Sequence, residues 1–127
     1  QGGAVKAASG MPMVQFSLVS MLELVSQGVL SMERMVELMS HNPARLFGIK
    51  NRGFLLPGMK ADLVLVGRDE LSYTIKESDI LSRVHWSPRT GDSLHWRVHK
   101  TWVNGRLVWD GNTVDASVHG QALEFGV

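Results

Sequence analysis

Cysteine is absent from this chain, and so are long apolar runs, blocks of like charge and glycine-rich phosphate loops. Without cysteine, disulfides and thiolate-bound metals are excluded, and the composition is typical of a reducing, cytoplasmic compartment. The best apolar stretch, residues 16–25, is broken by polar side chains and is well short of the roughly 20 residues that cross a bilayer. A net charge of +1 without a basic block predicts no nucleic-acid partner and no membrane partner.

What is present predicts a folded unit. The 127 residues are 44% apolar and 20% charged, which suits one modest domain or a piece of a larger one. The first residue is Gln1 rather than Met, and no secretory leader follows it. We therefore expect an internal piece or a processed product of a longer protein.

The first half of the chain carries helical patterns. Apolar side chains cover most of a helix over residues 16–27, which predicts a buried helix that ends at Gly28. Ser31 is placed to cap a second helix with one apolar stripe. Asn42-Pro43 predicts the N-cap and first residue of a short third helix. That helix should end at the next glycine, Gly48, so the pattern predicts a cluster of three helices over residues 16–48.

The second half carries β patterns. Pro57-Gly58 predicts a turn, and Asp62 is expected to accept backbone N–H bonds within that turn. The apolar run 63–66 has the length of a strand, whereas residues 67–95 are polar and are predicted to be irregular.

A hairpin is the clearest β element. Asn104-Gly105 lies between two β-prone runs and predicts a type I′ turn, which needs positive φ at both positions. The change of character near residue 50 divides the chain into residues 1–50 and 51–127. Each part is too small for a complete core, so each is expected to need partners from outside this chain.

Residues that could carry chemistry are sparse. The five histidines include no His-x-His pair, and His95 and His99 flank a predicted strand, where their spacing does not converge on one metal. The carboxylates of the polar stretch are expected to be solvated, and no Gly-x-Ser-x-Gly nucleophile elbow occurs. The seven methionines and four tryptophans are predicted to pack in the core and at its rim. The residues alone therefore predict no catalytic and no metal-binding side chain in this chain.

Three spaced motifs nevertheless resemble a known family. They read Asn-Pro-Ala-x-x-x-Gly followed by Gly-x-Leu-x-Pro-Gly-x-x-Ala-Asp-Leu, then Ser-Pro-x-x-Gly-x-x-Leu, then Thr-x-Val-x-Gly-x-x-Val. The first motif has two parts, which begin at Asn42 and Gly53, and the other two motifs begin at Ser87 and Thr101. From about residue 7 to residue 112 the chain resembles the C-terminal third of the dihydroorotases, which are cyclic-amide hydrolases of the amidohydrolase superfamily.

The resemblance implies an α/β fold. Residues 1–50 would supply an active-site loop and the last helices of a metal-dependent (β/α)8 barrel, and residues 51–127 would supply part of the accompanying small β-sandwich. It also implies a small-molecule substrate: reversible hydrolysis of dihydroorotate to N-carbamoyl-aspartate in pyrimidine biosynthesis. A homodimer is one assembly open to such a parent protein.

The resemblance also implies where the chemistry is held. Zinc ions would activate a water in the parent protein, and an aspartate would act as acid and base. Their ligands and that aspartate are expected before Gln1, so no metal is expected on this chain. Ser9 and Gly10 are expected to contact the substrate through their backbone, since glycine allows close approach. A flexible lead-in to the first helix is the alternative for these two residues.

The chain departs from the family pattern at four positions, namely Gln15, His41, Arg89 and Trp96. These departures leave open a related cyclic amidohydrolase of the allantoinase or hydantoinase type, or a catalytically silent paralogue. A non-catalytic module that completes a barrel supplied by another polypeptide is a further alternative.

Overall fold

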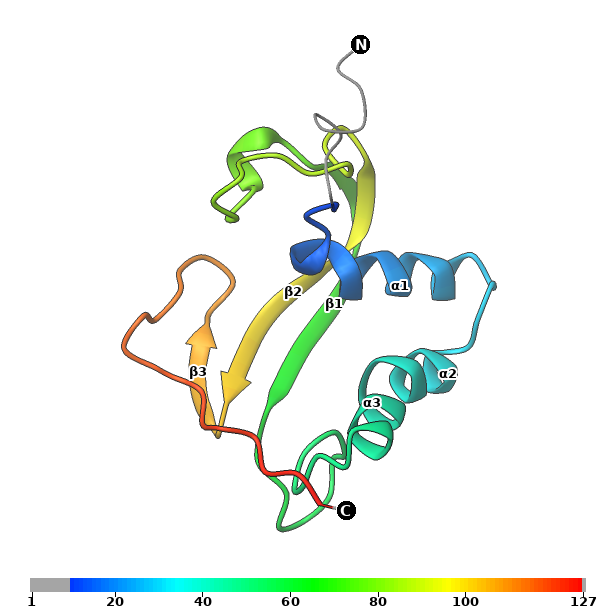
Figure 1. The fold of residues 1–127 in the computed structure, drawn as a ribbon. Coiled ribbons are helices and arrows are strands. Elements are labelled where there is room, and N and C mark those ends of the chain that lie inside the picture. The colour runs from blue at the N-terminus through cyan, green and yellow to red at the C-terminus, as the bar shows by residue number, and fades with distance from the viewer. Residues whose placement is uncertain (1–9, 127) are drawn as a thin grey trace, which may run out of the picture.

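The computed structural model describes residues 10–126, in which helices precede an antiparallel sheet (Figure 1). The sheet has three strands in the order β1-β2-β3, which are β1 (Leu63–Thr74), β2 (Ser93–Val103) and β3 (Arg106–Trp109). The helical elements are η2 (Val14–Phe16), α1 (Ser17–Ser26), α2 (Met32–Val36), η3 (Glu37–His41) and α3 (Asn42–Leu46). A short 3-10 turn, η4 (Glu77–Asp79), lies between β1 and β2. Within residues 10–126, no helix is long and apolar enough to cross a membrane.

Both helical runs end as the sequence predicts. Gly28 has φ +73°, and its N–H and that of Val29 bond back to the carbonyls of Val25 and Leu24, each at 3.0 Å. Gly48 has φ +61° and ends α3 through the same pair of backbone bonds. This is the Schellman arrangement, in which a left-handed residue turns the chain back onto the last free carbonyls. The predicted cap at Ser31 is also confirmed, because its Oγ accepts from the Arg34 N–H at 3.2 Å.

The predicted third helix is not separate. α2, η3 and α3 follow one another without a break, and Asn42 has helical angles, φ −67° and ψ −42°, so it is not an N-cap. The turn before Pro43 is instead a π-helix. In a regular α-helix the proline ring would collide with the carbonyl of Met39. A wider π turn gives the ring room and does not need the N–H that proline lacks.

The sheet is longer than predicted. β1 continues to Thr74 and β2 begins at Ser93, so the expectation of an irregular stretch over residues 67–95 is wrong at both ends. The second half of β1 is mostly exposed and is held by its pairing with β2. A strand that buries neither face shows no alternation of apolar and polar residues, so its sequence pattern does not predict a strand. The register shifts between Arg68 and Tyr73, which opens a bulge in β1.

The predicted turns are confirmed. Asn104 and Gly105 have φ +50° and +79°, as a type I′ hairpin turn requires, and join β2 to β3. At Pro57-Gly58 the N–H of Met59 bonds to the carbonyl of Leu56 at 3.1 Å, and Gly58 has φ +87°. These are the angles of a type II turn with proline and glycine at its centre.

The core lies where η2 and α1 cross the sheet (Figure 1). Its buried members are Phe16, Val19, Ile75, Ile80 and Leu94, against which Tyr73, Trp96 and Val98 pack. Both sides of the predicted boundary near residue 50 contribute to this core. The C-terminal segment runs back to the end of α3 (Figure 1), where the backbone N–H of Lys50 donates to the Glu124 carbonyl at 2.8 Å.

Candidate functional site

Of the two residues expected to contact substrate, only Gly10 lies within the described part of the chain. Ser9 lies outside the described residues. Gly10 is exposed, and a Cβ added there would meet no atom of residues 10–126 within 4 Å. The backbone at Gly10 is therefore open to a ligand, while substrate contact by Ser9 and Gly10 stays a prediction.

The segment that follows Gly10 is fixed by Gln15. Its amide nitrogen donates to the carbonyl of Asp79 at 2.6 Å, and its amide oxygen accepts from the N–H of Leu81 at 3.0 Å. The next residue, Phe16, is 5% exposed and belongs to the core. One side chain and one buried ring thus join this segment to the β1–β2 connection, more than sixty residues away in sequence.

Ser87 holds the same segment from a second point. It is 6% exposed, the only buried polar side chain among the described residues. Its hydroxyl donates to the carbonyl of Pro12 at 3.3 Å and accepts from the N–H of Arg89 at 3.3 Å. A buried hydroxyl without such bonds would carry a desolvation cost, so its two backbone partners explain its position.

Glu23 connects α1 with β2. Its carboxylate accepts from the backbone N–H of Trp96 at 3.1 Å and from the N–H of His95, and the His95 ring nitrogen Nδ1 lies 3.5 Å away. Burial raises the pKa of Glu23, but the two backbone bonds and the His95 side chain outweigh it, and the net pKa is lowered. The backbone N–H groups of His95 and Trp96 lie where the pairing register between β1 and β2 shifts. The ionised carboxylate of Glu23 is the hydrogen-bond acceptor for both groups.

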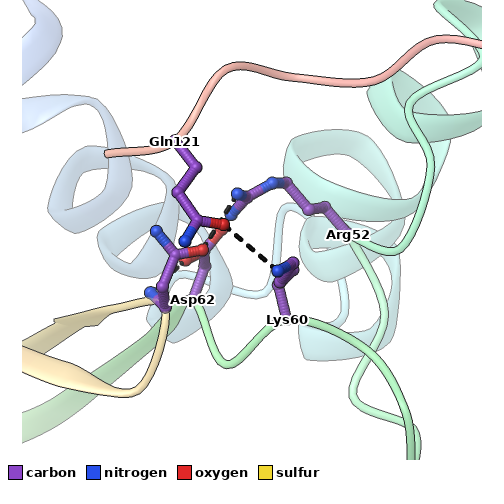
Figure 2. A network of polar contacts seen from close by, with 5 residues as sticks. Arg52, Lys60, Asp62 and Gln121 are labelled. Atoms are coloured by element: carbon purple, nitrogen blue, oxygen red, sulfur yellow. Dashed lines mark hydrogen bonds and ion pairs between the residues drawn. The ribbon is translucent and has the colours of Figure 1, made fainter. Parts of the chain in front are cut away.

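Asp62 has a different partner from the predicted one. Its carboxylate accepts from the N–H of Asn104, at 2.8 Å, and pairs with Arg52 (Figure 2). Arg52 also donates to the Asn104 side chain at 3.0 Å and is 13% exposed. The predicted bonds to the Pro57-Gly58 turn are therefore wrong, because tertiary folding brings the hairpin turn closer. Nearby, Lys60 Nζ donates to Gln121 Oε1 at 3.1 Å and so connects the segment before β1 with the C-terminal segment (Figure 2).

The histidines are engaged separately. His95 faces Glu23, and the ring of His41 stacks on Phe54 at 4.5 Å. His99 lies against Gly67, where a Cβ would collide with its ring. His95 and His99 lie inside β2 rather than at its ends, about 13 Å apart by the rise of an extended strand.

The side chains of the described residues are not arranged to bind a metal ion. Across residues 10–126, no group of three or more histidine, cysteine, aspartate or glutamate side chains is placed to hold a metal ion. A catalytic zinc takes three protein ligands and an open position. Glu23, the carboxylate beside a histidine, already accepts two backbone N–H bonds. The described residues therefore offer no ligand set for the zinc that the family resemblance implies.

A hollow of about 620 Å³ opens between η2, α1 and one face of the sheet. Its walls are mainly apolar, with Phe16, Val19 and Trp109 among them. Its cation, Arg97, pairs with Asp69 at 2.6 Å and stacks over the Tyr73 ring at 3.6 Å. Burial raises the pKa of Tyr73. These groups are bonded to one another and do not converge on the hollow as a binding set.

Three side chains that join distant segments of the chain, Gln15, Glu23 and Ser87, are not predicted from the sequence. Glu23 had a usable signal, because a lone carboxylate in an apolar helix must find a partner. Ser87 was visible only as the first position of a spaced motif, and Gln15 only as a departure from the family pattern. Their partners are backbone groups, which no side-chain pattern marks.

One solved structure and two curated proteins show what the chain is similar to. L-Hydantoinase (Dihydropyrimidinase) from Arthrobacter aurescens superposes with a TM-score of 0.80 and is 34% identical, over 87% of this chain and 25% of that chain. Dihydroorotase from Halobacterium salinarum is 39% identical over 112 residues, which is 87% of this chain and 26% of the relative. Dihydroorotase from Desulforapulum autotrophicum is 38% identical over 104 residues, which is 82% of this chain and 24% of the relative.

These likenesses define the class, a mixed helix and sheet unit of the amidohydrolase type. The model of the amidohydrolase family matches residues 5–108, and the chain belongs to that family. This match confirms the resemblance stated from the motifs. The chain spans about a quarter of the length of the curated relatives it matches.

Proposed function

We propose that this chain is the C-terminal part of a longer protein, here called the parent, that hydrolyses a cyclic amide, and that dihydroorotate is its substrate. The supporting observation is the match over residues 5–108, which spans all three motifs, together with the 39% identity to a dihydroorotase. On this proposal the parent opens the dihydroorotate ring to N-carbamoyl-aspartate, reversibly, in pyrimidine biosynthesis.

Residues 1–50 are proposed to end a (β/α)8 barrel, and residues 51–127 to form part of a β-sandwich beside it. The incomplete sheet supports this division, because β1 is an edge strand among the described residues and exposes Leu63, Val64 and Leu65. An exposed apolar edge strand is usually covered in an intact protein. Segments that precede this chain would supply the cover.

The proposed division also assigns the chemistry. Zinc supplies an activated water in enzymes of this kind and polarises a carbonyl. Its ligands would lie in parts of the parent outside this chain, whereas Ser9 and Gly10 would contact the substrate through their backbone. A homodimeric parent and a cytoplasmic location remain predictions, the second supported by the absence of cysteine.

A hydantoinase is the second candidate. The superposition on L-Hydantoinase (Dihydropyrimidinase), at a TM-score of 0.80, favours it. Both candidates open a ring at a C–N amide bond, so the substrate decides between them.

The test uses the full reading frame that contains this chain, expressed and supplied with zinc. Hydrolysis of dihydroorotate, hydantoin and allantoin is measured in parallel, and we expect the highest kcat/KM with dihydroorotate. A preference for hydantoin would establish the second candidate, and zinc binding without turnover of any ring would indicate a silent paralogue. The 127-residue chain is assayed alone as the control and should be inactive. Zinc-stimulated turnover by this chain would contradict the proposed placing of the catalytic residues.

A further inference from the structure

We propose that Ser87 and Gln15 are positioning residues, which hold the backbone at Gly10 in the place where it meets the substrate. The inference rests on the proposed function and deepens it. It assigns to the β1–β2 connection, residues 75–92, a role in substrate affinity.

The first support is the bond from Ser87. Its hydroxyl reaches the carbonyl of Pro12, only two residues from Gly10. Two residues of extended chain span at most about 7 Å, so a movement at Pro12 is passed on to Gly10. Because Ser87 is 6% exposed, water is a poor substitute for its hydroxyl.

The second support is the rigidity of the segment that carries Ser87. The N–H of Thr90 bonds to the Ser87 carbonyl at 3.1 Å, and Arg89 pairs with Asp92 at 3.0 Å. Ile75 exchanges two backbone bonds with this segment, one with Gly91 and one with Asp92, each at 2.9 Å. The backbone that carries Ser87 is therefore held in place by hydrogen bonds and an ion pair.

The third support is the attachment of Gln15, which lies after Pro12 in the sequence and is bonded independently of Ser87. Gln15 bonds to the backbone on both sides of Ile80, at Asp79 and Leu81. Ile80 itself is buried beside Phe16. The Gly10–Phe16 segment thus has two polar attachments and one apolar one, all to the β1–β2 connection.

The expected consequence is specific to binding. A contact that is equally strong in the ground state and the transition state contributes uniform binding, and the proposal assigns the backbone contacts at Gly10 to this kind. Losing their alignment raises KM and leaves kcat almost unchanged. A purely structural role would lower the amount of active protein, which lowers the apparent kcat and leaves KM the same.

The experiment uses zinc-loaded parent protein and the cyclic amide that it hydrolyses. Ser87→Ala and Gln15→Met are compared with matched controls, Ser72→Ala on β1 and Gln27→Met at the end of α1, both at exposed positions. Ser87→Thr keeps the hydroxyl. Gln15 is itself exposed, so its variant keeps the test available if Ser87→Ala does not fold.

We expect Ser87→Ala and Gln15→Met to raise KM about two- to tenfold, with kcat within about twofold. Ser87→Ala removes one hydrogen bond between the Gly10–Phe16 segment and the β1–β2 connection, and Gln15→Met removes two. Ser87→Thr and both controls should keep the wild-type KM. Backbone hydrogen exchange over residues 10–16 should become faster in the first two variants alone.

An unchanged KM in both variants would overturn the positioning role, whatever the exchange shows. Faster hydrogen exchange with an unchanged KM would show that Ser87 and Gln15 stabilise residues 10–16 without affecting substrate binding. Wild-type protein that hydrolyses no cyclic amide would overturn the proposed function, and this role with it. In active wild-type protein, a negative result therefore bears on the positioning role alone.

Discussion

Individual polar side chains connect distant backbone segments in this structure. Glu23, Asp62 and Ser87 each bind a backbone group that regular secondary structure does not satisfy. Buried N–H and C=O groups need partners, and each missing partner costs about 1–3 kcal/mol. Single residues therefore decide how the helices and the sheet are joined.

Glu23 should make the parent protein sensitive to acid. The pKa of its folded-state carboxyl is lowered from 4.5, so its contribution to stability is present above that value and is lost as pH falls toward the folded pKa. Glu23→Gln should reduce the free energy of unfolding by about 1–2 kcal/mol at pH 7. The deficit should shrink below pH 4.5. Chemical denaturation at several pH values measures this.

The control for Glu23 is Glu70→Gln, which changes an exposed carboxylate on β1. It should leave the free energy of unfolding within about 0.5 kcal/mol of wild type at each pH. A deficit in Glu23→Gln that stays the same at all pH values would show that the carboxylate does not act through its ionised form.

At the scale of elements, helix ends and turns follow from short sequence signals. Gly28 and Gly48 end their helices because a left-handed residue is required there, and Asn104-Gly105 turns the hairpin for the same reason. The π turn before Pro43 follows from proline too, but its form was not predicted. Proline forbids a regular continuation without choosing between a new helix and a wider turn.

The two helix-ending glycines give a matched pair of substitutions. Gly28→Ala should lower the free energy of unfolding by about 1–2 kcal/mol. The loss comes from the positive φ alone, because a Cβ there meets no atom of the described residues within 4 Å. At Gly48 the φ is similar, but a Cβ would collide with the Gly126 carbonyl. Gly48→Ala should cost about 1–3 kcal/mol more, as overpacking does.

Thermal or urea unfolding of the parent protein measures both glycine variants. Equal losses of stability in the two variants would mean that the C-terminal segment does not pack against Gly48. A larger loss in Gly28→Ala would contradict the expected order.

At the scale of the whole molecule, the described chain exposes much apolar surface for its size. Its core cluster has five buried members, whereas Leu46, Phe47 and Leu55 are 63–81% exposed. Large apolar side chains exposed in this number are typical of a surface that another part of the protein covers. The helices and the sheet therefore bury few side chains and leave many large apolar ones in contact with solvent.

The 127-residue chain by itself should be only marginally stable. We expect it to bind a hydrophobic dye and to associate, because its uncovered apolar faces remain in water. Light scattering and dye fluorescence measure this, with the parent protein as the control. A sharp, cooperative melt of a monomeric 127-residue chain would contradict the expectation.

The sequence by itself determined the local features and the family. Caps, helix ends and the hairpin turn depend on residues within a few positions of each other, and the spaced motifs carried the resemblance. Only the tertiary structure decided the long-range bonds of Gln15, Glu23 and Ser87, which span 64–75 residues of sequence. A side chain bonded to distant backbone leaves no periodic pattern, and only folding brings such partners together.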